Sequence, residues 1–338
     1  MKKIIYIIMI MVTAMNTSIA QQQDTTEATK PKLEISGSVD VYYRANLEGT
    51  FDLAPQTSFA NLPGFSLGMA NVIVAQEGEN FGFKADAVFG PRGEDATFLS
   101  PELRPGGSSN IINQLYAYWK VSKSVTLTLG NFNTFLGYEV ISPVDNFNYS
   151  TSYMFSYGPF SHTGFKADVD LSGGFTLMAG VFNPTDATEY NPVNDYAGGL
   201  QLGYSGGGAT VALNALLSDG FSQFDITAGY DVTDNVYVGL NATTASDNFS
   251  GIAAYLQVAT SDALKLGLRA ERFTDQGLGL VGDGESITDI TLSANYTIGN
   301  LTLIPEVRLD SYTKEFVIDN GETLNSLSSV VLAAVYSF

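Results

Sequence analysis

The chain has 338 residues, no cysteine and a formal net charge of −19. Apolar residues make up 45% of it and aromatic residues 12%, which excludes an intrinsically disordered protein because such chains hold too few apolar side chains to fold. Disulfide bonds are excluded too, so hydrogen bonds and the burial of apolar surface must stabilise the fold. The negative charge disfavours nucleic acid as a partner, since its phosphates would be repelled.

The N-terminus has the pattern of a secretory signal. Two lysines precede an apolar run over 4–15, and the small residues Ser18 and Ala20 come before a polar stretch that begins at Gln21. The pattern predicts a signal peptide over 1–20 that is cleaved after Ala20. A membrane-anchor helix is the alternative, but the run is shorter than the roughly 20 apolar residues that a spanning helix needs.

Residues 21–32 are polar and contain Pro31, and we expect them to form a flexible periplasmic lead-in. No later apolar run is long enough to cross a membrane as a helix. From Leu33 onward, however, apolar and polar residues alternate. In 301–310 the odd-numbered residues are Leu, Leu, Pro, Val and Leu, and the even-numbered ones are Thr, Ile, Glu, Arg and Asp. A period of two predicts strands with one apolar and one polar face.

Sixteen segments carry this pattern and are predicted strands. They lie at 33–45, 66–77, 79–90, 111–121, 124–132, 162–171, 174–183, 195–205, 208–218, 223–231, 234–244, 249–260, 263–273, 285–298, 300–312 and 327–338. Very short connections, such as 122–123 and 172–173, alternate with long ones at 46–65, 91–110, 133–161, 184–194, 274–284 and 313–326. Outer-membrane barrels show this asymmetry, with tight periplasmic turns and long external loops.

The predicted fold class is therefore all-β: a transmembrane antiparallel up-and-down β-barrel of about 16 strands over 33–338. Such a barrel would be integral to a bacterial outer membrane and in contact with its lipids. The rival interpretation is a secreted β-sandwich or a solenoid. It is disfavoured because the chain shows no repeat of about 20 to 50 residues and has aromatic residues at strand ends.

The last predicted strand ends in Phe338, with Tyr336 on the same side. A closing strand that ends in phenylalanine resembles the signal read by the bacterial barrel-assembly machinery, which is therefore an expected partner. An even number of strands would also place both termini at the end of the barrel that carries the tight turns.

The sequence offers little for catalysis or metal binding. His162 is the single histidine, and most hydrolytic dyads require one together with a nucleophile. The carboxylates are not spaced as a calcium loop, and the glycines at 206–208 lack the lysine of a phosphate loop. We expect no enzyme, no catalytic residue, no metal and no cofactor, and we expect His162 to hydrogen-bond locally at a rim or in a loop.

The connection 133–161 is the third predicted external loop and the longest. It contains two carboxylates and many Tyr, Phe and Asn residues, but no Lys or Arg. A loop this apolar is not expected to stay in water, so we predict that it folds into the barrel lumen. The candidate constriction residues on it are Glu139, Asp145, Tyr138, Asn146 and Tyr149.

Short motifs in and around this loop carry a family resemblance. They are 130–139 (GNFNTFLGYE), Pro143, Asn146, 149–152 (YSTS) and 159–164 (PFSHTG). They resemble the OmpL-like β-barrel porin family that is common in Bacteroidetes, and the likeness extends more loosely over 33–338. The resemblance implies a porin-type outer-membrane barrel. Thr151 departs from the family pattern, in which a basic residue is expected.

A barrel of about 16 strands is wide enough to leave an aqueous channel. The predicted function is therefore a porin for the passive diffusion of small hydrophilic solutes or ions, and a homotrimer is compatible with it. The alternative is a surface binding or structural barrel, such as a receptor, an adhesin or a secretion-complex partner, without open conductance. Long external loops are its support.

The alternation also predicts which charged side chains line the lumen. The candidate wall residues are Arg44, Lys84, Lys265, Arg269, Arg308, Asp40, Asp86, Glu306 and Asp310. If the carboxylates of the third loop face the basic members of this set, a transverse field would cross the constriction and sort solutes by charge and dipole. Alternatively, these charges pair along neighbouring strands. The sequence leaves both arrangements open.

Overall fold

The computed structural model describes residues 32–48, 53–97, 109–317 and 323–338. These residues belong to the unit Lys32–Phe338. The predicted signal peptide over 1–20 and all of the lead-in except Lys32 lie outside the described residues, so both stay predictions. Within the described ranges, no helix is long and apolar enough to cross a membrane.

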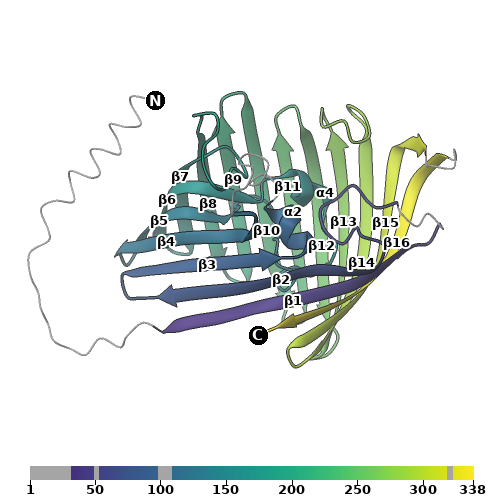
Figure 1. Ribbon diagram of the computed structural model, residues 1–338, viewed down its shortest axis with the longest axis horizontal. Coiled ribbons are helices and arrows are strands. Elements are labelled where there is room, and N and C mark those ends of the chain that lie inside the picture. The colour runs from purple at the N-terminus through teal and green to yellow at the C-terminus, as the bar shows by residue number, and fades with distance from the viewer. Residues whose placement is uncertain (1–31, 49–52, 98–108, 318–322) are drawn as a thin grey trace, which may run out of the picture. The chain divides into compact units, whose positions relative to one another are not determined.

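The described residues form a closed barrel of sixteen antiparallel strands, in which each strand pairs with its neighbours in sequence and β1 pairs with β16 (Figure 1). The strands are β1 (Leu33–Asn46), β2 (Gly64–Glu77), β3 (Phe81–Phe89), β4 (Ile112–Ser122), β5 (Val125–Asn133), β6 (Ser161–Ser172), β7 (Phe175–Phe182), β8 (Ala197–Gly206), β9 (Ala209–Ser218), β10 (Phe221–Thr233), β11 (Val236–Ala245), β12 (Phe249–Ala259), β13 (Leu264–Asp275), β14 (Ser286–Ile298), β15 (Leu301–Val317) and β16 (Thr323–Ser337). The predicted all-β barrel is confirmed.

Three short helical segments lie in two of the connections. They are α2 (Pro91–Ala96) and η1 (Ser109–Ile111) between β3 and β4, and α4 (Tyr153–Tyr157) between β5 and β6. The tight turns leave no room for helices and use glycine where the backbone turns left-handed. Gly207 has a φ of 61° between β8 and β9, and Gly299 has a φ of 59° between β14 and β15.

Strand boundaries agree with the predicted ones to within two residues except in the last hairpin. There, 313–326 was expected as a loop, but β15 continues to Val317 and β16 begins at Thr323. The residues Thr313, Lys314 and Glu315 are all exposed. Because polar side chains occupy both faces, the alternation disappears although the backbone pairing continues, with a register shift between Ser311 and Phe316.

Side chains of each strand alternate between the two faces of the barrel wall, as β13 illustrates. Leu266 is 40% exposed and points outward, whereas Arg269 is fully buried and points inward. The outer face carries a belt of exposed apolar side chains, including Leu292 and Val307. An apolar belt of this kind matches the hydrocarbon region of a membrane. The buried apolar clusters lie on the inner side, where strand residues meet connecting segments.

This alternation predicts a large difference between outward and inward substitutions. Leu266→Arg should destabilise the inserted barrel by about 2–4 kcal/mol, because it places a charge in the hydrocarbon layer. Thr302→Arg is the matched control, since Thr302 points inward on β15 and keeps partial exposure. Urea unfolding in lipid vesicles measures both. Equal costs for the two variants would contradict the assignment of faces.

Candidate channel interior

The segment 134–160, which joins β5 to β6, lies inside the barrel. Its Gly137 amide donates a hydrogen bond to Asp225 on β10 at 3.0 Å, and its Asn148 side chain donates to Ser293 on β14 at 2.7 Å. The Tyr149 hydroxyl donates to the carboxylate of Asp40 on β1. One segment can reach strands so far apart around a closed barrel only through the lumen. The prediction that the third long connection folds inward is therefore confirmed. We call 134–160 the inner loop.

Two carboxylates on the wall hold the inner loop by its backbone. Glu306 on β15 accepts hydrogen bonds from the consecutive amides of Tyr149 and Ser150, at 2.8 and 3.0 Å. Glu271 on β13 accepts from the first two amides of α4, each at 2.8 Å. Charge-assisted hydrogen bonds of this kind are about twice as strong as neutral ones. Each carboxylate is a two-point clamp, so the loop backbone has little freedom to move along the wall.

Arg269 on β13 connects the inner loop to the wall through ion pairs. Its Nη1 lies 2.8 Å from Glu139 on the loop, and its Nε lies 2.8 Å from Asp289 on β14. The same Nη1 donates to the carbonyl oxygen of Ser150 at 2.7 Å. Arg269 and Asp289 are fully buried and Glu139 nearly so. A buried ion pair tolerates this desolvation only when its remaining donors and acceptors are satisfied, as they are here.

Arg308 on β15, two strands away from β13, connects the inner loop to the wall in a similar way. Its Nη2 lies 2.7 Å from Asp310 on the same strand, and its Nη1 donates to the carbonyl oxygen of Thr151 at 2.8 Å. The two arginines thus bind consecutive carbonyl groups of the inner loop, while Glu306 and Glu271 bind its amides. A basic residue was expected in place of Thr151, and the structure shows the carbonyl oxygen of Thr151 held by a wall arginine.

Glycines on the inner face make room for the large side chains of the inner loop. A Cβ on Gly267 of β13 would lie 2.0 Å from the ring of Phe147, and one on Gly239 of β11 would lie 2.8 Å from Tyr138. The same relation holds for Gly251 and Met154. At Gly199 and Gly68 a Cβ would meet Phe135 and Tyr149 of the loop, although the wall side chains of Phe182 and Asp40 lie closer still. Glycine weakens a strand, so its presence inside one marks a place where another group approaches closely. We call these positions the glycine sockets.

The second long connection supports the inner loop from another side. Arg92 on α2 lies over the rings of Phe59 and Tyr149, with its guanidinium carbon 4.6 and 4.7 Å from the two ring centroids. It also donates to the carbonyl oxygens of Ile141 and Tyr149, at 3.3 and 2.9 Å. A buried guanidinium between two aromatic faces combines cation–π attraction with hydrogen bonding. The lumen is therefore filled by segments from more than one connection.

Burial of the inner face extends around the whole barrel. Each of the sixteen described strands has at least one buried inward residue, and one example per strand in order is Asp40, Asn71, Asp86, Gln114, Thr128, His162, Met178, Ala197, Asn214, Asp225, Asn241, Ala253, Arg269, Asp289, Arg308 and Val331. Partial exposure persists nearer the tight turns of β3 to β6. There Lys84 is half-buried, and the side chains of Lys166 and Asp168 are 23% and 41% exposed.

The family model described as "Putative beta-barrel porin-2, OmpL-like" matches residues 32–338. The chain belongs to this family. A search of curated protein sequences finds no match. The predicted family resemblance is thereby confirmed, and the family and the fold together make the protein a porin-like outer-membrane barrel.

Solved structures of outer-membrane proteins share the fold at low sequence identity. The trimer form of OmpT, an outer membrane protein of Vibrio cholerae, is 12% identical, with a TM-score of 0.59 over 91% of this chain and 99% of that one. A mutant of the Rh. blastica porin is 13% identical, with a TM-score of 0.56 over 91% of this chain and 100% of that one. These likenesses show the fold alone.

The residues predicted for the constriction of this porin-like barrel differ in exposure. Asp145 is exposed, Tyr138 is half-buried, and Glu139, Asn146 and Tyr149 are buried. Tyr138 stacks on Tyr255, with ring centroids 4.0 Å apart. The side chain of Asn146 hydrogen-bonds both the amide and the carbonyl of Val140, which closes a turn within the loop. The buried members therefore hold the inner loop in place, and Asp145 alone among the five is open to solvent.

The predicted wall residues also divide into buried and exposed groups. Lys265 is exposed and Lys84 is half-buried, whereas Arg44, Arg269, Arg308, Asp40, Asp86, Glu306 and Asp310 are buried. Arg44 donates to the carbonyl oxygen of Leu53 at 2.9 Å, and Asp86 accepts from Asn71 and Asn113. Most of these side chains are therefore engaged in structural contacts.

Glu139 does not contribute to the expected transverse field across the constriction. Glu139 contacts Arg269 directly and both side chains are buried, so the two charges do not face each other across water. The alternative, pairing along neighbouring strands, describes Arg269 with Asp289. The physical reason is desolvation: a loop packed onto the wall removes water from the gap, and each buried charge then needs a partner in contact.

Several residues of the interior escaped the sequence analysis. Arg92 lies in a connection without periodicity, and no local pattern relates it to Tyr149. The glycine sockets did leave a signal, because Gly199, Gly239 and Gly267 occupy inward positions within strands, where glycine is unfavourable. His162 is buried at the start of β6, with its Nε2 3.0 Å from the hydroxyl of Thr134. This hydrogen bond joins the start of β6 to the first residue after β5, 28 positions earlier in the chain.

A carboxyl group in the connection between β7 and β8 should make stability depend on pH. Asp186 accepts hydrogen bonds from the amides of Phe160 and Ser161, each at 2.8 Å. Burial raises the pKa of Asp186 to about 7, although these amides oppose the shift. The folded state then holds a proton that the unfolded chain has lost above about pH 4. Its stabilising effect is complete below that pH and is lost as the pH rises through about 7.

Asp186→Asn should remove this component and leave thermal stability flatter between about pH 4 and 7. Asp195→Asn, at an exposed position of the same connection, is the matched control. The measurement is the thermal midpoint of the detergent-solubilised barrel at each pH. A slope unchanged by Asp186→Asn would show that Asp186 does not carry the dependence.

Proposed function

We propose that the protein is a porin through which small hydrophilic solutes cross the outer membrane passively, with the inner loop restricting the channel. The proposal is carried by a closed barrel of sixteen described strands with a folded loop in its lumen, in a chain of the porin-2 family. A barrel of this strand number encloses more space than its own wall side chains fill. The inner loop then determines how much of that space is left.

The solute path that we propose follows β3 to β6, on the part of the wall that the inner loop leaves partly exposed. Lys84, Lys166 and Asp168 lie there, and Lys166 pairs with Asp168 at 3.0 Å. Charges of both signs along a path favour weak selectivity between anions and cations. At the tight-turn end, Asp145 and Lys265 line a cavity of about 310 Å³ between the inner loop and β12 to β16, and we propose that solutes pass it as they leave the barrel.

Single-channel recording in a planar bilayer tests the proposal. We expect discrete conductance steps from the purified protein, and a shift of selectivity toward anions in Asp145→Asn because that variant removes an exposed negative charge. Asp262→Asn is the matched control, since Asp262 lies in the turn between β12 and β13. Absence of conductance steps from correctly inserted protein would refute the porin function. Equal shifts in the two variants would mean that Asp145 does not line the path.

A second function is favoured by the buried inner face. Buried inward residues occur on all sixteen strands that the structure describes, and this would suit a barrel that binds a partner through its external connections without open conductance. The same bilayer recording separates the two functions. An inserted barrel that never conducts, yet retains its external connections, would favour the second.

We also propose a processing and assembly route that rests on the sequence. The mature chain would begin at Gln21 after signal cleavage, and the barrel-assembly machinery would recognise the strand that ends in Phe338. Phe338 is exposed and pairs with Gly37 of β1 through two backbone hydrogen bonds of 3.0 Å. A homotrimer is proposed by analogy with the trimer form of the Vibrio cholerae OmpT. N-terminal sequencing of the purified protein tests the cleavage site, and chemical cross-linking tests the homotrimer.

A further inference from the structure

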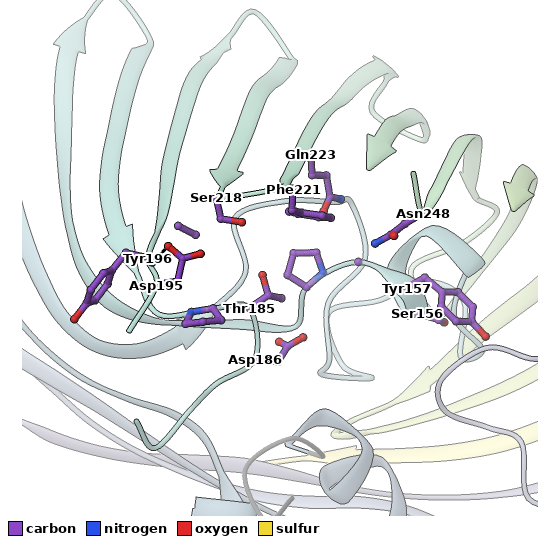
Figure 2. Close-up of a pocket in the computed structure, with 14 residues that line it drawn as sticks. Ser156, Tyr157, Thr185, Asp186, Asp195, Tyr196, Ser218, Phe221, Gln223 and Asn248 are labelled. Carbon is purple, nitrogen blue, oxygen red and sulfur yellow. Dashed lines mark hydrogen bonds between the residues drawn. The ribbon is translucent and has the colours of Figure 1, made fainter. Parts of the chain in front are cut away.

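A cavity of about 470 Å³ opens at the end of the barrel that carries the long connections (Figure 2). Residues 156–159, at the end of α4 on the inner loop, form one side of it. Its walls come from the connection 183–196, from the start of β10 and from Asn248 between β11 and β12. The cavity therefore lies directly on the inner loop, and its volume is within the range of small-molecule binding sites.

The chemistry of the cavity is aromatic and polar without positive charge. Tyr157, Tyr196 and Phe221 are among the residues that line it, as are uncharged hydrogen-bonding residues such as Thr185 and Asn248 (Figure 2). None of the described residues that line it is Lys, Arg or His. An anionic ligand would therefore find no countercharge. Flat apolar rings beside amide and hydroxyl groups suit a ligand that has apolar faces and many hydroxyls.

The two carboxylates that line the cavity, Asp186 and Asp195, leave its centre largely uncharged. Asp186 is turned toward the amides of Phe160 and Ser161, which already use one of its oxygens. Asp195 is exposed at the outer edge and accepts a hydrogen bond from the amide of Tyr196 at 2.8 Å. The centre of the cavity is thus left to neutral groups.

Gln223 has a hydrogen-bond acceptor without a partner among the residues that the structure describes, which indicates a bound ligand. Its side chain is 97% buried, with 3% of its surface exposed, and its Nε2 donates to the hydroxyl of Thr243 at 3.2 Å. Its Oε1 has no hydrogen-bond partner within the described part of the chain. An unsatisfied buried acceptor is costly and calls for an explanation. Because Gln223 lines the cavity, a donor from a bound molecule would satisfy it.

We infer that this cavity binds a neutral, polyhydroxylated solute of about monosaccharide to disaccharide size. A hydroxyl of the solute donates to Oε1 of Gln223, and the apolar face of its ring packs on Tyr157 or Phe221. Tyr196 covers the outer edge. The site holds the solute against the outer surface of the inner loop, so it selects neutral solutes before the constriction. This role in uptake rests on the proposed porin function, whereas binding itself does not.

Saturation-transfer NMR on the full-length protein in detergent tests the site, with sucrose as the probe and gluconate as an anionic comparison. We expect saturable binding of sucrose and none of gluconate. Tyr196→Ala and Gln223→Met should each weaken sucrose binding by about tenfold, because each removes one contact to the solute. Tyr190→Ala is the matched control. Tyr190 lies on the same connection with similar exposure, at 41% against 48% for Tyr196, but outside the cavity.

Unchanged sucrose affinity in Tyr196→Ala, or equal binding of sucrose and gluconate, would overturn the inference. If Gln223→Met fails to fold, judged by heat-modifiable migration, Tyr196→Ala decides, because Tyr196 is exposed. The outcome is separable from the channel function. Conductance steps without sucrose binding would reject the site and leave the porin, whereas sucrose binding without conductance would reject the porin and leave the site.

Discussion

Arg269→Met is expected to destabilise the barrel by about 3–5 kcal/mol, because it leaves two buried carboxylates without their countercharge. Arg269 bridges Glu139 on the inner loop and Asp289 on the wall, each at 2.8 Å. It also binds the carbonyl oxygen of Ser150, so the variant loses three contacts at once, two of them to the inner loop. Urea unfolding of the vesicle-inserted protein measures the loss.

Arg272→Met is the matched control for this prediction. Arg272 lies three residues further along β13, but it is exposed on the outer face, and its Nη1 donates to Thr288 at 3.1 Å. We expect a change below about 1 kcal/mol, as for other exposed polar contacts. Adding Glu139→Gln to Arg269→Met should recover part of the stability, since one uncompensated charge is removed. Equal losses for Arg269→Met and Arg272→Met would show that the buried network does not stabilise the fold.

Gly267→Val is expected to displace Phe147 from the wall and to loosen the inner loop. The new Cβ would lie 2.0 Å from the ring, and the obstruction is the near part of an aromatic side chain packed in the lumen. Overpacking of this kind costs about 1–3 kcal/mol. In single-channel recordings the variant should show higher or more variable conductance, because the loop no longer rests in one position.

Shortening the ring should reverse the effect of Gly267→Val. In the double variant Gly267→Val with Phe147→Ala, the valine side chain occupies the space that the phenylalanine ring has left. We therefore expect the double variant to be more stable than Gly267→Val alone. Gly198→Val is the control, because a Cβ at Gly198 of β8 meets only a backbone oxygen at 3.9 Å. If the double variant is no better than the single one, Phe147 does not occupy the socket.

Arg269 and Gly267 both contribute to the fixed position of the inner loop. Ion pairs, backbone clamps and glycine sockets act on different parts of 134–160, and each alone would hold it only locally. Together they make the loop part of the wall. In the proposed channel, such a loop would give a constant width, and the selectivity would depend on the exposed Asp145 and Lys265 and the partly exposed Lys166.

Strand positions could be predicted because the period of two is a local property. Each side chain faces lipid or the interior according to its position in its own strand, so 301–310 shows its two faces without reference to any other segment. The inward folding of 134–160 was also predictable, since an apolar loop cannot remain in water. The prediction was wrong for 313–326, where the polar run Thr313, Lys314 and Glu315 puts polar side chains on both faces, so that hydrophobicity carries no information about backbone pairing there.

The sequence by itself determined the class of fold, the faces of the strands and the inward folding of the third long connection, because each depends on the chemistry of a short stretch. Only the tertiary structure decided what the charges do. Glu139 and Arg269 are separated by 130 positions in the chain, and their contact depends on the path of the inner loop across a lumen that exists only after β1 pairs with β16. The same closure brings Phe147 to Gly267 and Arg92 to Tyr149. Charges expected to face water were thus buried as pairs, because a packed lumen excludes the water that would otherwise separate them.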